Sequence, residues 1–486
     1  MIAQRLSDIL RRDLPVDPEI TGITADSRKV EGGTLFAALP GHQSDGRTFI
    51  SQALAQGAAA VLAPEDTPAE AAPVLVKSGD VRRSYALAAR AFYGPQPKTC
   101  VAVTGTNGKT SVTVFCRQIW ATLGRKSASM GTLGVTLNSN GGEHSISAPG
   151  LTSPDAGDAA RLVAELATQG VTHLALEASS HGIEQRRIDG IGLTAAAFTN
   201  LTQDHLDYHG DMDAYRAAKL RLFEALAPRG GSAVLNADSP AYNAFAAASI
   251  LSGLNILTVG QRGRNLSLVS RTPTPEGQRL VIDADGRSYD VLLPLAGAFQ
   301  ASNAMVAAGL CVATGEKVED VLGAFQRLQG AKGRLERIGT GAKGGEVYVD
   351  YAHTPDGLET VLRSLRPHTK GRLLVVFGCG GDRDRIKRPL MGAVAEKLAD
   401  QAIVTDDNPR GEDPSAIRKQ VLNGAPSARD IGDRGLAIRT AVSELRQGDI
   451  LVVAGKGHEQ GQIVGETVYP FDDATEVARA LKGETV

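Results

Sequence analysis

The chain is poor in aromatic residues and in cysteine. Of its 486 residues only 4% are aromatic, with a single Trp, and its four cysteines, Cys100, Cys116, Cys311 and Cys379, are far apart. Proteins that stack single-stranded nucleic acid need clustered aromatics, and zinc or iron–sulfur sites need closely spaced cysteines. Both kinds of site are therefore disfavoured. Few and scattered cysteines also indicate a reducing compartment.

Long apolar runs and an excess of positive charge are missing as well. No run approaches the roughly 18 apolar residues of a membrane span. Residues 1–14 place apolar side chains at helical spacing but lack the apolar centre of a signal peptide. The formal net charge is −2, so no basic field favours nucleic acid. We expect a cytoplasmic monomer that binds no nucleic acid and spans no membrane.

Glycine, in contrast, is abundant, with 55 residues. Many glycines with few aromatics suit an α/β protein, because strand-to-helix turns use glycine. The length predicts about two to four domains, and three blocks suggest themselves. We expect a mixed α/β domain over 1–95, a central domain with a mostly parallel sheet over 96–332, and a Rossmann-like domain over 333–486. Within the central block, residues 255–292 predict hairpins.

A phosphate-binding loop follows the apolar run at 100–103. Residues 104–111 read Thr-Gly-Thr-Asn-Gly-Lys-Thr-Ser and precede a helix-like stretch. In such a loop the backbone N–H groups face the anion, Lys109 reaches the outer phosphates, and the Thr110 hydroxyl can ligate Mg²⁺. The common nucleotide loop would need glycine where Val103 stands, so this loop is a tighter version. A plain glycine turn seldom combines a lysine with two hydroxyls, so the chain is predicted to bind ATP or GTP.

Three residues of the central block are candidate cation ligands. Glu177 and His205 each follow a β-type run, although an isolated Glu is often a cap or a surface charge and such a His often only forms hydrogen bonds. Residues 211–226 predict a helix with Lys219 on its apolar face. Burial would leave Lys219 as a neutral amine that can react with CO₂ to give an anionic carbamate. The alternative is that Lys219 snorkels to water at the edge of this face.

The third block predicts a cleft for an amino acid. Four β-type runs each end in a polar motif, and ligands of open α/β sheets bind beyond the carboxyl ends of the strands. Arg383 and Arg410 suit bidentate carboxylate binding. The side chains that could accept hydrogen bonds from an ammonium are those of Asp407, Asn408 and Glu459. A surface salt-bridge network explains the same composition nearly as well.

The motifs TGTNGKTS, LEASSHG, NLTQDHLDYHG…YRAAK, GRLE, DYAHTPD, GGDRD, DDNPR and GKGHE occur in this order. In their order and spacing they resemble the Mur ligases, the ATP-dependent amide-bond-forming enzymes of peptidoglycan assembly, over essentially the whole chain. The segments at 25–28 and 41–47 resemble the UDP-binding domain of the members that add the third residue. DDNPR resembles the amino-acid pocket of diaminopimelate-adding members, whereas lysine-adding members lack the terminal arginine. Ser153 and Ala178 stand where threonine and valine are common, which are conservative departures.

The resemblance implies a role for each matching position. It implies a carbamylated Lys219 that holds Mg²⁺ together with Thr110, Glu177 and His205, and it makes Lys109, Glu177, His205 and Lys219 the catalytic residues. The implied ATP contacts are Gly105, Thr106, Asn107, Gly108, Lys109, Thr110, Ser111, Asn303, Arg334 and Asp350. The UDP-N-acetylmuramoyl dipeptide would be held by Ala25, Ser27, His42, Gln43, Ser44, Thr152, Ser153, Ser179, Gln185 and Arg187. Diaminopimelate would be held by Arg383, Asp407, Asn408, Pro409, Arg410, Gly455 and Glu459.

The implied reaction joins the D-glutamyl side-chain carboxylate to an amine of meso-diaminopimelate through an acyl phosphate, with closure of the C-terminal block over the central one. Three alternatives stay open. A lysine-adding member would differ at DDNPR, and a folylpolyglutamate-synthase-like ligase would leave the N-terminal block unexplained. A nucleotide-gated binding module would close without ligation.

Overall fold

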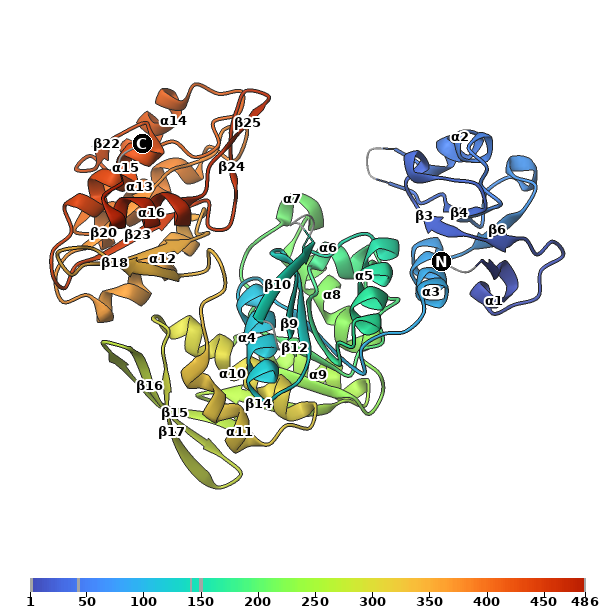
Figure 1. Ribbon diagram of the computed structural model, residues 1–486, viewed down its shortest axis with the longest axis horizontal. Helices are drawn as coiled ribbons and strands as arrows, with labels where there is room; N and C mark the ends of the chain where they lie inside the picture. Colours follow the sequence, from blue (N-terminus) through green and yellow to red (C-terminus); the bar gives the residue numbers. More distant parts are fainter. Residues whose placement is uncertain (1–2, 42–43, 140–141, 148–151, 485–486) are drawn as a thin grey trace. The chain divides into compact units, whose positions relative to one another are not determined.

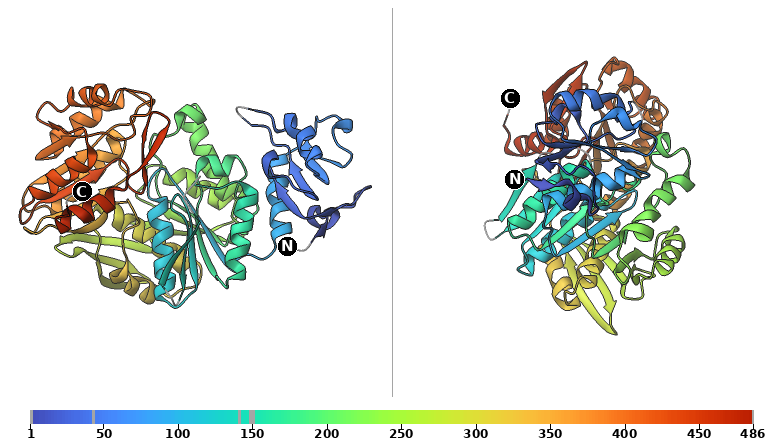
Figure 2. Two further views of the ribbon diagram at one scale, coloured as in Figure 1. Left: turned by 45° about the horizontal axis from the view of Figure 1, so that its top comes forward. Right: turned by 90° about the vertical axis from the view of Figure 1, so that its right-hand side faces the viewer.

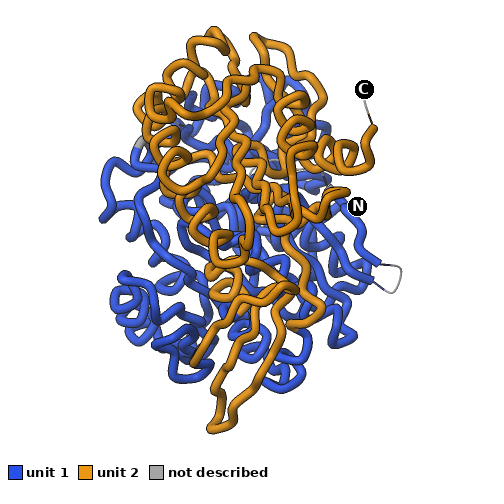
Figure 3. The backbone as a smooth tube through the Cα atoms, turned by 90° about the vertical axis from the view of Figure 1, so that its left-hand side faces the viewer, with its two compact units in different colours: residues 1–267, 305–324 blue, residues 268–304, 325–486 orange. Residues whose placement is uncertain are grey.

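The computed structural model describes residues 3–41, 44–139, 142–147 and 152–484. The chain divides into two compact units. Figure 3 shows the first, residues 1–267 and 305–324, in blue, and the second, residues 268–304 and 325–486, in orange. The phosphate loop lies in the first unit, and the motifs after residue 333 lie in the second.

The N-terminal part of the first unit is built on a four-stranded parallel sheet in the order β3-β4-β5-β6. Leu35 and Leu62 pack on one face with helix α3, and Phe36 and Val61 pack on the other face with helix α2. This alternation follows from the twofold repeat of a strand. The elements are β1 (Gln4–Arg5), α1 (Leu6–Leu10), β2 (Glu19–Ile20), β3 (Gly22–Thr24), β4 (Thr34–Ala37), α2 (Ile50–Ala55), β5 (Ala60–Pro64), β6 (Leu75–Ser78) and α3 (Val81–Tyr93).

The central sheet of the first unit is mostly parallel, with strand order β10-β9-β8-β11-β7-β12-β13-β14. Only β9 and β10 run antiparallel to their neighbours. Helix α4 packs against β8 and β11, and α5 covers the opposite face (Figures 1 and 2). The elements are β7 (Thr99–Thr104), α4 (Lys109–Thr122), β8 (Ser127–Gly131), β9 (Gly134–Ser139), β10 (Gly142–Ser147), α5 (Ala156–Thr168), β11 (His173–Glu177), α6 (Ser180–Glu184), β12 (Ala195–Phe198), α7 (Leu206–His209), α8 (Met212–Arg221), β13 (Ser232–Asn236), α9 (Tyr242–Leu251), β14 (Asn255–Gly260) and α11 (Val318–Gly323).

The hairpin prediction for 255–292 is wrong at its start and correct at its end. β14 pairs in parallel with β13, because helix α9 connects the two strands and a helical crossover returns the chain in the same direction. β16 and β17 form an antiparallel hairpin that turns at Asp285 and Gly286. These elements are β15 (Leu266–Thr274), β16 (Gly277–Ala284), β17 (Arg287–Leu293) and α10 (Ala298–Ala313).

The C-terminal part of the second unit is a six-stranded sheet in the order β18-β19-β23-β20-β21-β22, parallel except for β18. Helices α12, α13 and α14 cover one face, and α15 and α16 cover the other. Strands buried on both faces explain the continuous apolar runs. The elements are β18 (Glu336–Thr340), β19 (Glu346–Asp350), α12 (Pro355–Leu365), β20 (Leu373–Phe377), α13 (Lys387–Leu398), β21 (Gln401–Val404), α14 (Pro414–Leu422), β22 (Arg429–Asp430), α15 (Arg434–Ser443), β23 (Ile450–Ala454), β24 (Gly461–Val464), β25 (Thr467–Pro470) and α16 (Asp473–Lys482).

The α/β class is therefore confirmed, with a parallel sheet in each of the three predicted blocks. The helix predicted over 211–226 is confirmed, but it passes from α-helical to π-helical geometry near its end. α8 ends at Arg221, and residues 222–226 form a π-helical turn. No helix among the described residues is long and apolar enough to cross a membrane.

Candidate active site

The phosphate loop connects β7 to the N-terminus of α4, at the carboxyl edge of the central sheet. Gly105 has a φ of +152°, and a Cβ there would lie 1.9 Å from Oγ1 of Thr199. The loop is held from outside, since the side-chain Oδ1 of Asn200 accepts from the N–H of Asn107 at 2.9 Å. The ammonium of Lys109 folds back onto the carbonyl oxygens of Gly105 and Thr106 at 2.8 and 2.7 Å. A preformed loop with an inward lysine is suited to an anion.

Lys219 is buried beside this loop, with 1% of its surface exposed. Its Nζ donates to the carbonyl oxygen of Gly105 at 2.9 Å and lies 4.4 Å from the centre of the Tyr215 ring. Burial lowers the pKa of Lys219 well below its usual range; the charge of Lys109 lowers it further, and Asp204 acts in the opposite direction. The snorkelling alternative is therefore wrong, because the amine is buried, and the lowered pKa favours the neutral form that carbamylation requires.

Glu177, the last residue of β11, lies at the centre of a hydrogen-bonded network. Its Oε1 accepts from the N–H of Thr132 at 2.8 Å, and its Oε2 accepts from the Thr132 hydroxyl at 3.2 Å. A Cβ at Gly131 would lie 2.1 Å from Glu177 Oε1, so glycine is required for this approach. The Thr132 hydroxyl also contacts that of Thr152 at 3.0 Å.

The other central residues predicted for the dipeptide substrate belong to the same network. The Ser153 hydroxyl donates to the Glu177 carbonyl at 3.2 Å and contacts the Ser179 hydroxyl at 3.1 Å. Arg187 donates to the Ser153 carbonyl at 2.9 Å and to Oε1 of Gln185 at 2.6 Å. Burial lowers the pKa of Arg187. The structure thus brings these predicted residues together around one carboxylate.

His205 adopts a left-handed conformation with φ of +53° at the start of α7. Its ring is half exposed, contacts Asp204 at 3.4 Å and lies edge-on to the ring of His181 with 5.0 Å between centroids. In the part of the chain that the structure describes, no three His, Cys, Asp or Glu side chains are gathered closely enough to hold a metal ion. Side chains of these four types alone therefore do not make a metal site here.

Two of the residues predicted for the UDP end, Ala25 and Ser27, line a pocket of about 1030 Å³ in the first unit. The Ser27 hydroxyl donates to Oε1 of Gln52 at 3.2 Å. Ser44 is exposed, and its carbonyl accepts from Gly41 at 3.0 Å. The predicted residues at 42 and 43 lie outside the described residues.

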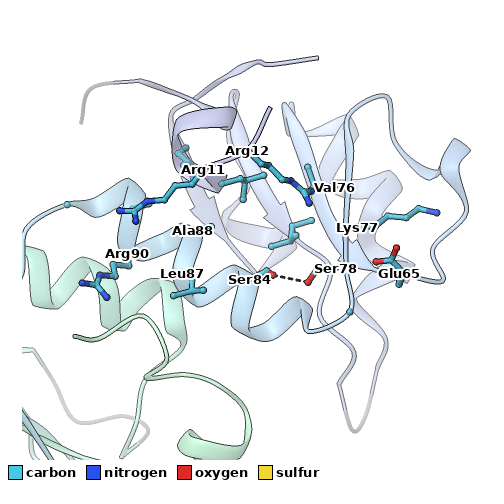
Figure 4. Close-up of a pocket in the computed structure, with 16 residues that line it drawn as sticks. Arg11, Arg12, Glu65, Val76, Lys77, Ser78, Ser84, Leu87, Ala88 and Arg90 are labelled. Atoms are coloured by element: carbon cyan, nitrogen blue, oxygen red, sulfur yellow. Dashed lines mark hydrogen bonds between the residues drawn. The ribbon is translucent and has the colours of Figure 1, made fainter. Parts of the chain in front are cut away.

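A second pocket, of about 760 Å³, lies among α1, β6 and α3 (Figure 4). Arg11, Arg12, Lys77 and Leu87 are among the residues that line it, and the hydroxyls of Ser78 and Ser84 are 2.8 Å apart. No residue predicted for the UDP end lines it.

Three residues predicted to contact ATP lie in the second unit: Asn303, Arg334 and Asp350. The guanidinium of Arg334 stacks over Tyr351, with 4.5 Å between Cζ and the ring centre. Asp350, the last residue of β19, accepts from the N–H groups of Leu335 and Ala352 at 2.6 and 2.7 Å. Burial raises the pKa of Asp350 to about 6, against the opposing charge of Arg334. Asn303 donates to Gln300 Oε1 at 3.2 Å.

The predicted amino-acid pocket is assembled from the loops after β20, β21 and β23. Asp407 is 8% exposed, and no described residue donates a hydrogen bond to its carboxylate. A Cβ at Gly455, where φ is +119°, would lie 2.7 Å from Asp407 Oδ2. The Oε2 of Glu459 accepts from Nδ2 of Asn408 at 3.0 Å. The loops therefore bring two carboxylates into the pocket, and one of them has no protein donor among the described residues.

The two predicted arginines flank Gly380. A Cβ there would lie 2.9 Å from Nη1 of Arg410 and 3.9 Å from Cγ of Arg383. Arg410, in a left-handed conformation with φ of +50°, donates to the carbonyls of Gly381 and Asn408 at 3.0 and 3.4 Å. Pro409, between Asn408 and Arg410, is buried. Among the described residues neither guanidinium has a carboxylate partner, so the surface salt-bridge alternative does not hold for the two arginines, whereas Glu459 pairs with Lys456 at 3.3 Å.

Sequence reasoning missed Thr132, Tyr351 and Lys456 as parts of these sites. Lys456 is fully buried, and its Nζ contacts Oδ1 of Asn408 at 3.0 Å and Oε2 of Glu459 at 3.3 Å. It lies within the GKGHE motif, so a lysine between two glycines after a buried strand was the signal that could have found it. Thr132 had no such signal, because its role depends on the neighbouring strand.

Comparison with known proteins gives consistent results along the chain. Family models described as "Mur ligase family, catalytic domain", "Mur ligase middle domain" and "Mur ligase, glutamate ligase domain" match residues 19–92, 103–311 and 333–457. A protein of Caulobacter vibrioides named UDP-N-acetylmuramoyl-L-alanyl-D-glutamate–2,6-diaminopimelate ligase is 63% identical over 483 residues, 99% of each chain. A relative of the same name from Chelativorans is 49% identical over 96% of this chain and 95% of its own length. A solved structure of that name superposes with a TM-score of 0.74 at 33% identity, covering 99% of both chains.

Proposed function

The chain belongs to the Mur ligase family, and we propose that it joins meso-2,6-diaminopimelate to UDP-N-acetylmuramoyl-L-alanyl-D-glutamate with conversion of ATP to ADP and phosphate. Identity of 63% over 99% of both chains supports the same reaction as in the Caulobacter relative. We place the reaction in the cytoplasm, where ATP and the nucleotide-linked precursor would be available. We also propose that the enzyme acts as a monomer, since a single chain carries all the predicted sites.

The observation that carries the proposal is the charge arrangement of the amino-acid pocket. Asp407 is nine-tenths buried and receives no hydrogen bond from a described residue, whereas Arg383 and Arg410 have no carboxylate partner in the same part of the chain. A buried charge without a partner is costly, which applies to Asp407, whereas Arg383 is exposed and Arg410 is half-buried. An amino acid with an ammonium and two carboxylates would satisfy all three groups. Lysine would leave a guanidinium unpaired, and sites of this kind discriminate strongly.

ATP activates the acceptor by a phosphoryl transfer. The D-glutamyl carboxylate oxygen attacks the γ-phosphorus, the bond to the β-phosphate bridging oxygen breaks, and ADP leaves. Lys109 and the N–H groups of the loop stabilise the charge that develops on the phosphate oxygens. The diaminopimelate amine, after losing a proton, then attacks the acyl carbon, and phosphate leaves through a tetrahedral intermediate. An amide bond is formed.

The donor chemistry proposed here would fit Mg²⁺, which binds one or two carboxylates and keeps several waters. No three His, Cys, Asp or Glu side chains among the described residues gather around a metal position, so a further protein oxygen would strengthen the site. The neutral amine of Lys219 would supply one as a carbamate. Thr110, Glu177, His205 and this carbamate would hold the ion, which when bound would screen the repulsion between carboxylate and phosphate.

We assign the UDP end of the substrate to the pocket lined by Ala25 and Ser27 and the dipeptide to the network around Glu177. We also assign three domains, 1–95, 96–332 and 333–486, and each family-model match lies inside one of them. The two compact units divide the chain differently, since 268–304 groups with the C-terminal residues.

Product analysis by mass spectrometry tests the proposal. The full mixture contains enzyme, ATP, Mg²⁺, the UDP-linked dipeptide and meso-diaminopimelate, and one component is omitted in turn. We expect a product heavier than the dipeptide precursor by one diaminopimelate less one water, only in the full mixture. ADP formation without the amino acid and without a new product would instead support a nucleotide-gated binding module.

A further inference from the structure

Lys456 of the GKGHE motif has a fully buried side-chain charge, and it has no place in the reaction described above. It follows β23 and has none of its surface exposed. A buried ammonium is costly unless it is paired and hydrogen-bonded. Its two partners are Oδ1 of Asn408 at 3.0 Å and Oε2 of Glu459 at 3.3 Å. Both partners are residues of the proposed amino-acid pocket.

Asn408 makes three side-chain hydrogen bonds within the protein. Its Oδ1 accepts from Lys456 Nζ and from the N–H of Ile463, both at 3.0 Å. Its Nδ2 donates to Oε2 of Glu459 at 3.0 Å. Oε2 of Glu459 therefore receives two hydrogen bonds, from an amide and from an ammonium. No described residue donates to Oε1, and the Glu459 side chain is 35% exposed, so this oxygen is accessible to a ligand in the pocket.

The backbone on both sides of Lys456 has little freedom. Gly455 has a φ of +119° and approaches Asp407, and Gly457 has a φ of +55°, where a Cβ would lie 2.7 Å from Cβ of Tyr351. Glycine adopts such conformations at the lowest cost, and a Cβ at Gly457 would also collide with Tyr351. The lysine is therefore anchored by close backbone packing as well as by its two hydrogen bonds.

We propose that Lys456 is a positioning residue for amino-acid recognition, which fixes Glu459 so that its Oε1 faces the substrate ammonium. Lys456 does not contact the substrate. Its ammonium holds one carboxylate oxygen and the Asn408 amide in a fixed arrangement, so the pocket is ordered before the amino acid arrives. This inference rests on the proposed function, because it assumes that the pocket binds an amino acid.

The test is the kinetics of Lys456→Met, which keeps the length of the side chain and removes its charge. Lys397→Met, at an exposed lysine of α13, is the matched control. Loss of a charge-assisted hydrogen bond to Glu459 should raise the KM for meso-diaminopimelate about tenfold or more. The KM values for ATP and the UDP-linked dipeptide should change less than about twofold. An unchanged diaminopimelate KM, or an equal rise in all three, would overturn the proposal.

A double-mutant cycle with Glu459→Gln separates positioning from a general structural effect. If Lys456 acts through Glu459, adding Lys456→Met to Glu459→Gln should raise the diaminopimelate KM by less than about twofold further. Additive effects of the two substitutions would contradict the proposal.

Thermal unfolding provides a test even if the Lys456→Met variant does not fold. It also tests the role of Lys456 independently of the proposed function. Glu459→Gln removes the counter-ion of a buried ammonium, so its Tm should fall by several degrees. An unchanged Tm would contradict the role of Lys456. Wild-type enzyme that turns over no amino acid would refute the proposed function, and the Tm comparison would still decide whether Lys456 is paired with Glu459.

Discussion

The Nζ of Lys219 lies 2.9 Å from the carbonyl oxygen of Gly105, the first glycine of the phosphate loop. Lys109 donates to the same oxygen at 2.8 Å. Two lysines on one carbonyl repel each other, and burial together with this repulsion lowers the pKa of Lys219. The phosphate loop thus contributes to the lowered pKa of the amine that we propose is carbamylated.

We expect Lys219→Ala to lose turnover by at least about a hundredfold, as is typical when a preorganised charge-stabilising group is removed. Added formate or acetate should restore part of the rate, because a small carboxylate can occupy the space of the carbamate. Steady-state phosphate release measures both effects. Lys98→Ala, at an exposed position of the same unit, is the control and should behave like the wild type. Wild-type turnover in Lys219→Ala would remove the carbamate from the mechanism.

Arg410→Ala should impair diaminopimelate use far more than ATP use. The guanidinium has no carboxylate partner among the described residues, and its loss should raise the amino-acid KM about tenfold to a hundredfold. The KM for ATP should stay close to its wild-type value. Arg363→Ala, on the exposed side of α12, is the matched control. Unchanged amino-acid kinetics in Arg410→Ala would refute the assignment of this residue.

Asp350 should make the free energy of unfolding fall as pH rises from about 4 to about 6. Its pKa is raised from 3.8 to about 6 in the folded chain, so between these values the folded state keeps a proton that the unfolded state has lost. The stabilisation is complete below pH 4 and is lost above pH 6, with a size of about 3 kcal/mol. Urea unfolding of wild type and Asp350→Asn across this range isolates the effect. The difference between the two free energies should shrink with rising pH, and parallel curves would contradict the assignment.

Removing one partner of the buried ion pair between Arg434 and Asp473 should destabilise the fold more than removing both partners. Nε and Nη2 of Arg434 each lie 2.7 Å from a carboxylate oxygen of Asp473, and both side chains are fully buried. Arg434→Met alone should lower the free energy of unfolding by about 3–5 kcal/mol, because it leaves an unpaired charge. Adding Asp473→Leu should recover most of this loss. Denaturant unfolding measures the free energy of unfolding of each variant. A double variant as unstable as Arg434→Met alone would contradict the explanation by an unpaired buried charge.

The strands and their polar ends could be predicted from the sequence, because a strand buried on both faces is a continuous apolar run. The runs that end at Glu177, Asp350 and Asp407 are recognisable in this way, and the structure has β11, β19 and β21 there. The prediction of a hairpin at β14 is wrong because it overlooks helix α9 before the strand. The π-helical turn at 222–226, which buries Leu222 and Phe223 in the core, was also not predicted from the sequence.

Residues proposed to contact a substrate could be predicted from the sequence. Residues that act by holding another side chain in place were harder to predict. Lys219 stands out by its place on an apolar helix face, and its burial excludes snorkelling to water, while carbamylation stays a prediction. Thr132 does not stand out, because its role comes from its contact with Glu177. Lys456 stands between two glycines after a buried strand, but only its contact with Glu459 shows its role. Spacing along one chain does not reveal such contacts.

The most direct test of the account is phosphate release with ATP, Mg²⁺ and UDP-N-acetylmuramoyl-L-alanyl-D-glutamate, with meso-diaminopimelate and L-lysine supplied in parallel. The account predicts steady release with diaminopimelate and only background release with lysine, because Arg410 needs a second carboxylate. Preference for lysine would contradict the assignment of the Arg410 pocket. Release with neither would contradict the proposed acceptor.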